Sequence, residues 1–259
     1  LSSRGPASDG RIKPTLLAVF DGDSAMSDGN PATGAGNGDL HWAGTSYSTP
    51  SAAGAAAIVR QYFVDGWYPA ARPVPANSMN PSAALVRAVL IASGAQVTGG
   101  GTVYRTTDNR WPNNEQGFGR ILLSNVLPIA ASGDTFRTQV VDSEDGLLTG
   151  DEFTTTFHVT NPGRLRIVLA WNDYPGTLGA AKALVNDLDL EVTAPDGTVY
   201  RGNNFGTFAQ GESAPGGSFD ATNVEEAVIL KAAIAGDWTV RVIGSNIPIG
   251  PQRFAVVAT

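Results

Sequence analysis

The chain contains no cysteine and only two histidines, His41 and His158. Without a thiol, the sequence excludes disulfides, thiolate catalysis and cysteine-ligated zinc, so any metal ligand must be an oxygen or an imidazole. Long apolar runs are lacking as well. The best candidate, Ala83–Ala95, is too short to span a bilayer and contains Arg87, so we expect no membrane-spanning segment. The N-terminal residues show no targeting signal, and we expect the chain to begin within a larger protein.

Basic residues are in the minority. The 17 Lys and Arg against 24 Asp and Glu give a formal net charge of -7, and the basic residues form no cluster. Nucleic acid and anionic membranes are therefore poor candidates for partners. The hydrophobic fraction of 42% over 259 residues allows a substantial core, which excludes a disordered or fibrous chain. The length corresponds to about one or two domains.

The first half of the chain alternates apolar elements with turn-rich segments. Residues 11–20 end in a continuous apolar run, which predicts a strand buried on both faces of a parallel sheet. Residues 21–40 are rich in Gly, Asp and Asn and predict a long surface loop. A helix of mostly small residues follows Gly44, and we expect it to be buried. With Asn80 as N-cap and Pro81 as first helical residue, a second helix is predicted to run to about residue 95. Its expected core face consists of Leu85, Val86, Val89 and Leu90.

The second half of the chain changes to a period of two. Apolar residues such as Phe153 and Phe157 alternate with polar ones, and turn signals such as Asn161–Gly163 separate many short runs. This pattern predicts an antiparallel sandwich or jelly roll. We place the boundary at residues 129–134, which gives domains of residues 1–128 and 134–259. The inward aromatic positions are predicted to be core, namely Phe153, Phe157, Trp171 and Trp238. Trp111 and Phe208 lie in turn-rich segments, and their exposure stays open.

One motif in the first half points to chemistry. It runs Gly44-Thr45-Ser46-Tyr47-Ser48-Thr49-Pro50, with Ala53-Gly54 after it. A serine in the first turn of a helix lies where backbone N–H groups and the helix dipole converge on a developing oxyanion. Ser46 is therefore a candidate nucleophile, and the alternative is a structural N-cap serine.

This motif resembles the nucleophile motif of subtilisin-like serine proteases, the subtilase family. Two upstream segments, Ser2–Pro6 and Asp9–Pro14, resemble the stretch that precedes the motif in that family. Four later segments resemble bacterial alkaline subtilases that carry a C-terminal jelly-roll domain. They are Gly117–Arg120, Leu184–Leu190, Asn223–Glu225 and Asn246–Gln252.

The resemblance implies a fold and an activity. The fold is an α/β partial subtilisin-like catalytic domain, with a parallel sheet and helices, followed by an all-β jelly-roll or sandwich domain. The activity is that of a secreted serine endopeptidase, which hydrolyses protein or peptide substrates through an acyl-enzyme on Ser46. The backbone N–H of Ser46 would donate to the oxyanion, and Thr45 would support that site.

A serine hydroxyl also needs a histidine that accepts its proton and a carboxylate that orients the histidine. Subtilases supply these in the order Asp, His, Ser. The 45 residues before Ser46 contain no matching segment, so we expect the catalytic Asp, His and oxyanion Asn in an N-terminal half outside this chain, and the chain alone to be inactive. His41 is interpreted as a loop histidine, and His158 is assigned no chemistry.

A second function stays open beside the protease. Residues 15–20 depart from the family pattern, which usually continues with an Asp, a short apolar run and Ala-Pro-Gly. Together with the missing triad partners, this departure favours an inactive subtilase remnant that serves as a calcium-stabilised binding or structural module. The intact motif around Ser46 opposes that alternative.

Acidic residues at expected strand ends in the second domain suggest a metal. Calcium takes about six to eight oxygen ligands and tolerates irregular geometry, and the resembling proteases bind calcium. Asp173, Asp187 and Glu225 are the predicted ligands of a structural calcium ion. The alternative is a solvated strand face, because Asp187, Asp189 and Glu191 alternate with apolar residues.

Overall fold

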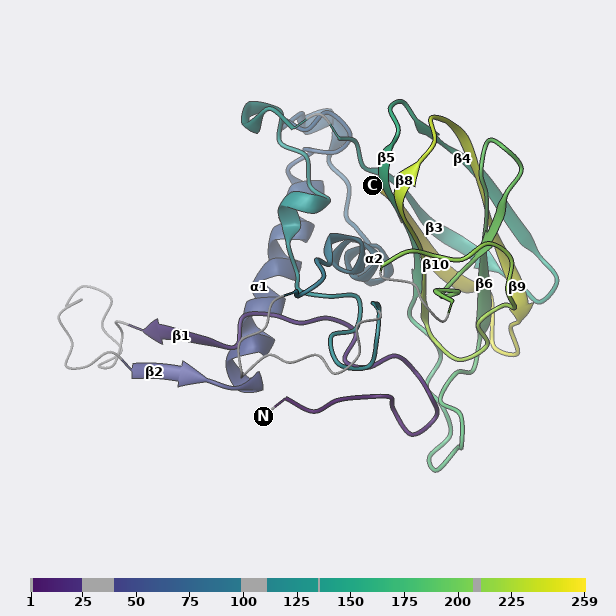
Figure 1. Ribbon diagram of the computed structural model, residues 1–259, viewed down its shortest axis with the longest axis horizontal. Helices are drawn as coiled ribbons and strands as arrows, with labels where there is room; N and C mark the ends of the chain where they lie inside the picture. Colours follow the sequence, from purple (N-terminus) through teal and green to yellow (C-terminus); the bar gives the residue numbers. More distant parts are fainter. Residues whose placement is uncertain (1, 25–39, 99–110, 135, 207–210) are drawn as a thin grey trace.

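The computed structural model describes residues 2–24, 40–98, 111–134, 136–206 and 211–259 (Figure 1). Over these residues the protein is mostly β-sheet with few helices. The helices are α1 (Thr45–Val64), α2 (Ala83–Ser93) and the short 3-10 helices η1 (Pro75–Asn77), η2 (Leu123–Asn125) and η3 (Ala130–Ser132).

Eight strands form two four-stranded antiparallel sheets that face each other. In spatial order, the first sheet consists of β3 (Gln139–Leu147), β10 (Gln252–Ala258), β5 (Gly163–Trp171) and β8 (Glu225–Ala233). The second consists of β4 (Glu152–Val159), β9 (Gly236–Asn246), β6 (Asp187–Thr193) and β7 (Val199–Arg201). The β domain predicted from the period of two is thereby confirmed.

The space between the two sheets holds the main core. Trp171 and Trp238 are 0% and 1% exposed and lie within it, as predicted. Phe157 is also buried there, and Phe153 packs against the same cluster while partly buried. Trp111 belongs to a second cluster and is 4% exposed. Phe208 lies outside the described residues.

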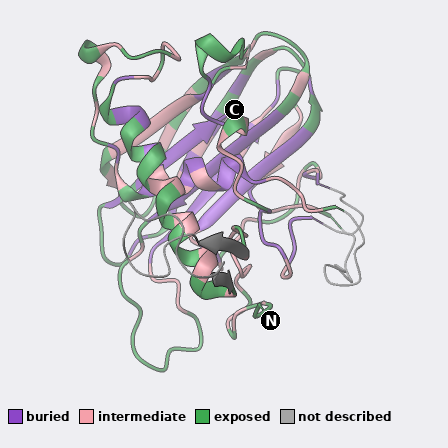
Figure 2. Cartoon of the chain, turned by 90° about the vertical axis from the view of Figure 1, so that its left-hand side faces the viewer, coloured by how far each residue is buried: buried purple, intermediate pink, exposed green. Residues whose placement is uncertain are grey.

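The second core lies between α2 and the outer face of the first sheet (Figure 2). Leu85 and Val89 of α2 are fully buried, as predicted, while Val86 and Leu90 are partly buried. The predicted N-cap is wrong by two residues, because Ser82 caps α2 and its hydroxyl accepts from the Leu85 N–H at 3.0 Å. Both halves of the chain therefore contribute to one core. The predicted boundary coincides with η3, and the division into two domains stays a prediction.

Two expectations for residues 11–40 are wrong. The predicted strand is reduced to a parallel bridge between Leu17 and Arg120, because no described strand lies beside it to continue the pairing. The predicted loop begins and ends with paired strands, β1 (Asp21–Ser24) and β2 (Leu40–Ala43), which form a hairpin. Residues 25–39 lie outside the described part.

The expected burial of the small-residue helix is also wrong for this chain. Only Val59, Tyr62 and Phe63 of α1 are buried, and Figure 2 shows a largely exposed helix at the front of the molecule. Among the described elements, no four-stranded sheet covers the N-terminal half of α1, so Ala53 and Ala57 are exposed and the other alanines of the helix are only half-buried.

Candidate active site

The N-terminal end of α1 carries the predicted nucleophile. Gly44 is the N-cap residue and has φ 115°, a conformation that glycine adopts without strain. Ser46 is the second residue of the helix and is exposed, as is Thr45. The N–H of Gly44 donates to the carbonyl of Phe20 at 2.9 Å. This bond fixes the start of the helix to the segment that precedes β1.

Two backbone donors at this helix end are open. The carbonyl of Gly44 accepts from the N–H groups of Tyr47 and Ser48 at 3.0 and 3.2 Å. Within the described residues, the N–H groups of Thr45 and Ser46 have no partner. The N-terminal end of a helix also carries a partial positive charge. These features suit the stabilisation of an oxyanion beside the Ser46 hydroxyl.

The described residues do not supply a base for Ser46. The Ser46 hydroxyl forms no hydrogen bond with any of them. His41 lies in β2, and its side chain is outside the described part of the structure. His158 lies on β4 in the sandwich, where its Nδ1 is 2.7 Å from Asp237 Oδ1. A serine hydroxyl is a weak nucleophile without a neighbouring base, so this part of the chain does not form a triad.

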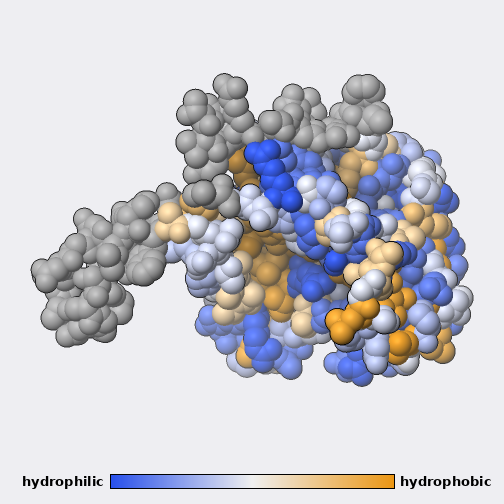
Figure 3. All heavy atoms as spheres, turned by 90° about the horizontal axis from the view of Figure 1, so that it is seen from below, coloured by the Kyte–Doolittle hydropathy of each residue, from blue (hydrophilic) through white to orange (hydrophobic). Residues whose placement is uncertain are grey.

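A cavity of about 490 Å³ opens beside the start of α1. Apolar residues line much of it, among them Leu16, Leu17, Ala52 and Ile121, and the rest of the lining includes Arg4, Thr45, Ser48, Thr49, Glu115 and Gln116. Figure 3 shows hydrophobic residues gathered on the face of the molecule that carries this end of α1. An apolar concavity beside open backbone donors is typical of a ligand or substrate site.

Two glycines hold the segment that lines this cavity. Gly119 has φ 100°, and a Cβ there would lie 2.3 Å from the carbonyl oxygen of Ala95. Gly117 has φ 55°, and a Cβ there would lie 2.0 Å from the carbonyl oxygen of Pro14. The carbonyl of Gly119 accepts from the Leu17 N–H at 2.9 Å. The Gly-Phe-Gly motif therefore allows the backbone approach that positions residues 14–17.

Replacing Gly119 by alanine should destabilise the protein strongly. The methyl group would meet a carbonyl oxygen, and the residue would also hold an unfavourable φ, so we expect a loss of at least about 2 kcal/mol in urea unfolding. The matched control is Gly133→Ala, where φ is 75° but no atom lies within 4 Å of the added methyl. Equal losses in both variants would contradict the close approach.

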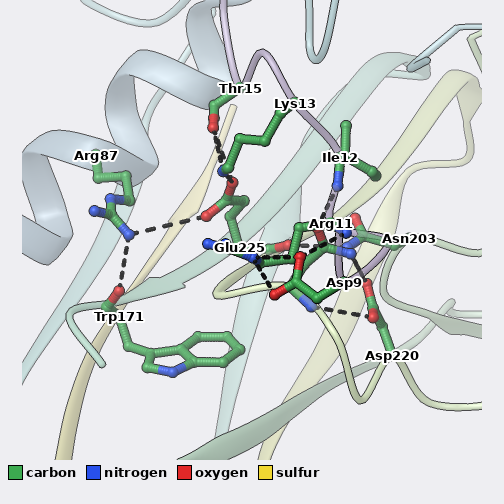
Figure 4. A network of polar contacts seen from close by, with 11 residues as sticks. Asp9, Arg11, Ile12, Lys13, Thr15, Arg87, Trp171, Asn203, Asp220 and Glu225 are labelled. Carbon is green, nitrogen blue, oxygen red and sulfur yellow. Dashed lines mark hydrogen bonds and ion pairs between the residues drawn. The ribbon is translucent and has the colours of Figure 1, made fainter. Parts of the chain in front are cut away.

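Glu225 connects this segment to the sandwich (Figure 4). Its carboxylate is nearly fully buried at the start of β8, and Oε1 accepts from Lys13 Nζ at 2.7 Å and from Thr15 Oγ1 at 3.0 Å. Arg87 Nη1 lies 3.8 Å from Oε2 and donates to the carbonyl of Trp171 at 3.1 Å. The buried charge of Glu225 is thus matched by two cations from the first half of the chain.

Asp9 and Asn223 add two further links between the first half of the chain and the sandwich; Asp9 and Arg11 are drawn in Figure 4. Asp9 pairs with Arg11 at 2.8 Å and accepts from the Ala183 N–H at 3.0 Å. The side-chain oxygen of Asn223 accepts from the Ile12 N–H at 2.8 Å. Residues 9–15 are therefore anchored on the sandwich at several points, and they include Asp9–Pro14, the stretch that resembles the segment before the nucleophile in subtilases.

The three predicted calcium ligands do not form one group. Asp173 accepts backbone N–H bonds from Tyr174, Val185 and Asn186 at 2.7–2.8 Å. Glu225 is held by its cations, as described above. Across the described ranges, no three His, Asp or Glu side chains come together as a metal site. Asp187 differs from Asp173 and Glu225, because its Oδ1 is buried without a hydrogen-bond partner.

The acidic face of β6 is not solvated. Asp187 and Asp189 are 9% and 3% exposed, so the interpretation as a solvated strand face is wrong for both. Burial, and then the neighbouring Asp189, raise the pKa of Asp187 to about 6. Burial also raises the pKa of Asp189, against the effect of its hydrogen bond from Ser245.

Glu226 is a further buried carboxyl, which the sequence motifs did not single out. This residue is fully buried, its Oε2 accepts from the Leu190 N–H at 2.8 Å, and its Oε1 has no partner. Burial raises the pKa of this carboxyl well above its usual range. The signal was present in the period of two, because Glu226 lies two and four residues before Val228 and Leu230 and so shares their core-facing side of β8.

Comparison with known proteins identifies the first part of the chain. The model of the family described as Subtilase family matches residues 1–119. The chain is 31% identical over 306 residues to the Serine protease/ABC transporter B family protein tagB of Dictyostelium discoideum, and 31% identical over 304 residues to tagD of the same organism. Each match covers 99% of this chain and 16% of the relative. A third relative, tagA, is 30% identical over 273 residues, which is 99% of this chain and 15% of that protein.

The structure shows a mostly β-sheet protein with few helices, and the family model matches its first part. Residues 1–119 match the model of the subtilase family and the relatives are named serine proteases, which confirms the resemblance seen in the sequence. The chain spans about one sixth of the length of the curated relatives it matches. None of the helices in the described ranges is both long and apolar enough to cross a membrane.

Proposed function

We propose that this chain provides the nucleophile of a secreted subtilisin-like serine endopeptidase. The observation that carries the proposal is the start of α1, where Ser46 is exposed, two backbone donors are open, and Thr45 and Ser48 line a mostly apolar cavity. The match to the subtilase family and relatives named serine protease support the class of reaction. Substrates would be proteins or peptides.

In the proposed reaction, Ser46 Oγ attacks the carbonyl carbon of the scissile peptide bond and its proton passes to a histidine. The carbonyl oxygen becomes an oxyanion that accepts a hydrogen bond from the Ser46 N–H, with Thr45 in support. Collapse of this intermediate breaks the C–N bond, the histidine protonates the leaving amine, and water then hydrolyses the acyl-enzyme. The histidine, its aspartate and an oxyanion-binding asparagine would come from residues outside this chain.

The exposed surface of α1 supports an N-terminal half of the catalytic domain as a partner. Ala53, Gly54, Ala57 and Ile58 are exposed on the helix, and Ile58 is 54% exposed. Small residues allow a second backbone to approach closely, and an exposed apolar surface usually marks an interaction site. The partner half would cover α1 and bring the base to Ser46.

The direct test is labelling with a fluorophosphonate, which reacts with an activated serine. We expect labelling only of a longer product that includes the upstream half, and loss of that labelling in Ser46→Ala. The matched control is Ser48→Ala on the same turn, where the Ser48 hydroxyl is 3.4 Å from the carbonyl of Gly44 and has another role. Absence of labelling in the folded longer product would favour the alternative, an inactive remnant that acts as a calcium-stabilised binding or structural module.

We further propose that the eight sandwich strands form a jelly roll that stabilises the protease or helps to position its substrates. The strand orders β3-β10-β5-β8 and β4-β9-β6-β7 support this topology. The anchoring of residues 9–15 through Asp9, Asn223 and Glu225 supports a stabilising role.

Calcium binding by the sandwich stays a prediction. The environment of Asp187 is compatible with it, whereas those of the other two predicted ligands, Asp173 and Glu225, are not. Asp187 has an unpartnered buried oxygen, whereas Asp173 and Glu225 already have their own donors. If the ion binds, millimolar calcium should raise the melting temperature above that in chelator, because a ligand of the native state stabilises it. The Asp187→Asn variant should lose this rise. A melting temperature that calcium and chelator leave unchanged would remove calcium from the proposal.

A further inference from the structure

The two sheets of the sandwich have four edge strands, namely β3, β8, β4 and β7. Other parts of the chain cap three of these edges. The capping contacts are Val140 N–H on β3 to Tyr68 Oη (3.3 Å), Ser213 N–H to Ile229 C=O on β8 (2.7 Å) and Gly216 N–H to Val199 C=O on β7 (2.8 Å). Unpaired strand edges are templates for further pairing, so the fourth edge is the one of interest.

The fourth edge strand, β4, is long and regular. It pairs with β9 over eight residues, Glu152–Val159, without a bulge, and β9 is its only strand neighbour among the described elements. It contains no proline, glycine or lysine, the residues that commonly protect an edge. β4 lies on the side of the sandwich away from α1 (Figure 1), so the exposed surface of α1 does not extend to it.

The outward backbone groups of β4 can be assigned. The His158 N–H reaches the Gln139 side-chain oxygen at 3.4 Å, and the Gln139 side-chain nitrogen reaches the His158 carbonyl at 3.3 Å. Both groups of His158 therefore point away from β9. Because direction alternates along a strand, the N–H and C=O groups of Thr154 and Thr156 also point outward. In the described part of the chain these groups have no partner.

The sequence of β4 is complementary to itself. Around Thr155, Thr154 mirrors Thr156, Phe153 mirrors Phe157, and Glu152 mirrors His158. In an antiparallel pair of identical strands with a two-fold axis at Thr155, threonine would face threonine, phenylalanine would face phenylalanine, and an acid would face a histidine. Such cross-strand pairs stabilise a sheet, and Thr and Phe favour strands.

We propose that β4 is an interface for a second copy of this chain, joined edge to edge by antiparallel pairing centred on Thr155. Thr154 of each copy would exchange backbone hydrogen bonds with Thr156 of the other, which gives about four such bonds. Pairing at His158 would displace the half-buried side chain of Gln139, whose two contacts with the His158 backbone are long. Gln139 thus acts as a removable cap at one end of the edge.

The charges on the outer face are compatible with this dimer. Glu152 contacts Arg241 at 3.3 Å, and His158 contacts Asp237 at 2.7 Å within each copy. Across the proposed interface, Arg241 and Glu152 of one copy would be followed by His158 and Asp237 of the second copy. Positive and negative side chains would therefore alternate when the histidine is protonated. A generic extended peptide would not reproduce this match, which is why the second copy is the favoured occupant.

The absence of cysteine makes a specific cross-link test possible. In the proposed pairing, the two Thr155 residues form a non-hydrogen-bonded pair with Cα atoms about 4.5 Å apart, within the range of a disulfide. Thr155→Cys should therefore give a reducible dimer on oxidation. The matched control is Thr239→Cys, which lies on β9 within the same sheet and is more exposed than Thr155. Equal cross-linking of both variants, or none of Thr155→Cys, would overturn the proposal.

Sedimentation of the unlinked protein gives an independent readout. Thr156→Pro removes an outward N–H but leaves the β4–β9 bonds, as edge prolines do, and should weaken self-association at least tenfold. Thr156→Ala keeps the N–H and should associate like the parent, and near-UV circular dichroism checks that both variants fold. Association that survives in folded Thr156→Pro belongs to another surface, such as α1, and contradicts this interface. A parent chain that stays monomeric at all concentrations contradicts it as well.

Discussion

Arg166→Ala is expected to lower the free energy of unfolding by about 3–5 kcal/mol. Arg166 lies on β5, is 4% exposed, and has no carboxylate partner among the described residues. Its guanidinium donates to the carbonyl of Ala92 at 2.8 Å and to that of Gly94, where α2 ends, and it lies 5.2 Å from the ring centroid of Trp111. Truncation would leave two carbonyls without their donor and open a cavity under the helix.

The measurement is urea unfolding monitored by circular dichroism, with two comparison variants. Arg166→Met fills much of the volume of the side chain but has no N–H donors. Its loss in free energy of unfolding should therefore be smaller than that of Arg166→Ala, and it measures the contribution of the hydrogen bonds. Arg164→Ala lies two residues away on the same strand and is exposed, and it should change stability by about 0.5 kcal/mol or less. If Arg166→Ala and Arg164→Ala lost the same amount, the contact between β5 and α2 would not hold the two halves together.

Arg166 also illustrates why part of the fold was predictable and part was not. The strands of the sandwich were predicted because the alternation of core-facing and outward-facing residues is visible within the sequence of each strand. The burial of α1 was predicted wrongly because it depends on a sheet that the described residues do not contain. Residues 11–20 failed as a strand for the same reason, since a strand needs a neighbour and Leu17 has only the bridge to Arg120.

The candidate site likewise has a part that the sequence predicted and a part that it did not. The motif around Ser46 could be recognised because its residues are adjacent in the sequence, and the start of α1 lies where the motif indicated. The contact of Glu225 with Lys13 joins residues more than 200 positions apart, and no local pattern reports such a pairing. Asp187 was chosen as a metal ligand for its position at a strand end, but its burial depends on segments that fold over β6 from elsewhere in the chain.

The buried carboxyls of the sandwich should make the protein more stable in mild acid than in mild base. The pKa of Asp187 is raised to about 6, by burial first and then by the neighbouring Asp189, and burial raises the pKa of Glu226 well above its usual range. A carboxyl with a raised native pKa binds more protons in the folded state than in the unfolded state. Stability from these groups is therefore full below the unfolded pKa of about 4 and is lost as pH rises through the native pKa.

Urea unfolding between pH 4.5 and 8, in the presence of chelator, measures this loss. We expect the contribution of Asp187 to be about 2 kcal/mol across that range. The Asp187→Asn variant cannot ionise there, so its stability should fall less with pH than that of the parent, and it should be the more stable protein at pH 8. The matched control is Asp196→Asn, in a turn where the carboxylate is exposed and accepts from the Thr198 N–H. The hydrogen bonds from Thr198 lower the pKa of Asp196, so this carboxylate stays ionised above pH 5 and the slope there should match the parent. A parent protein whose stability rises from pH 5 to 8 would show that a bound cation or another group neutralises these carboxyls.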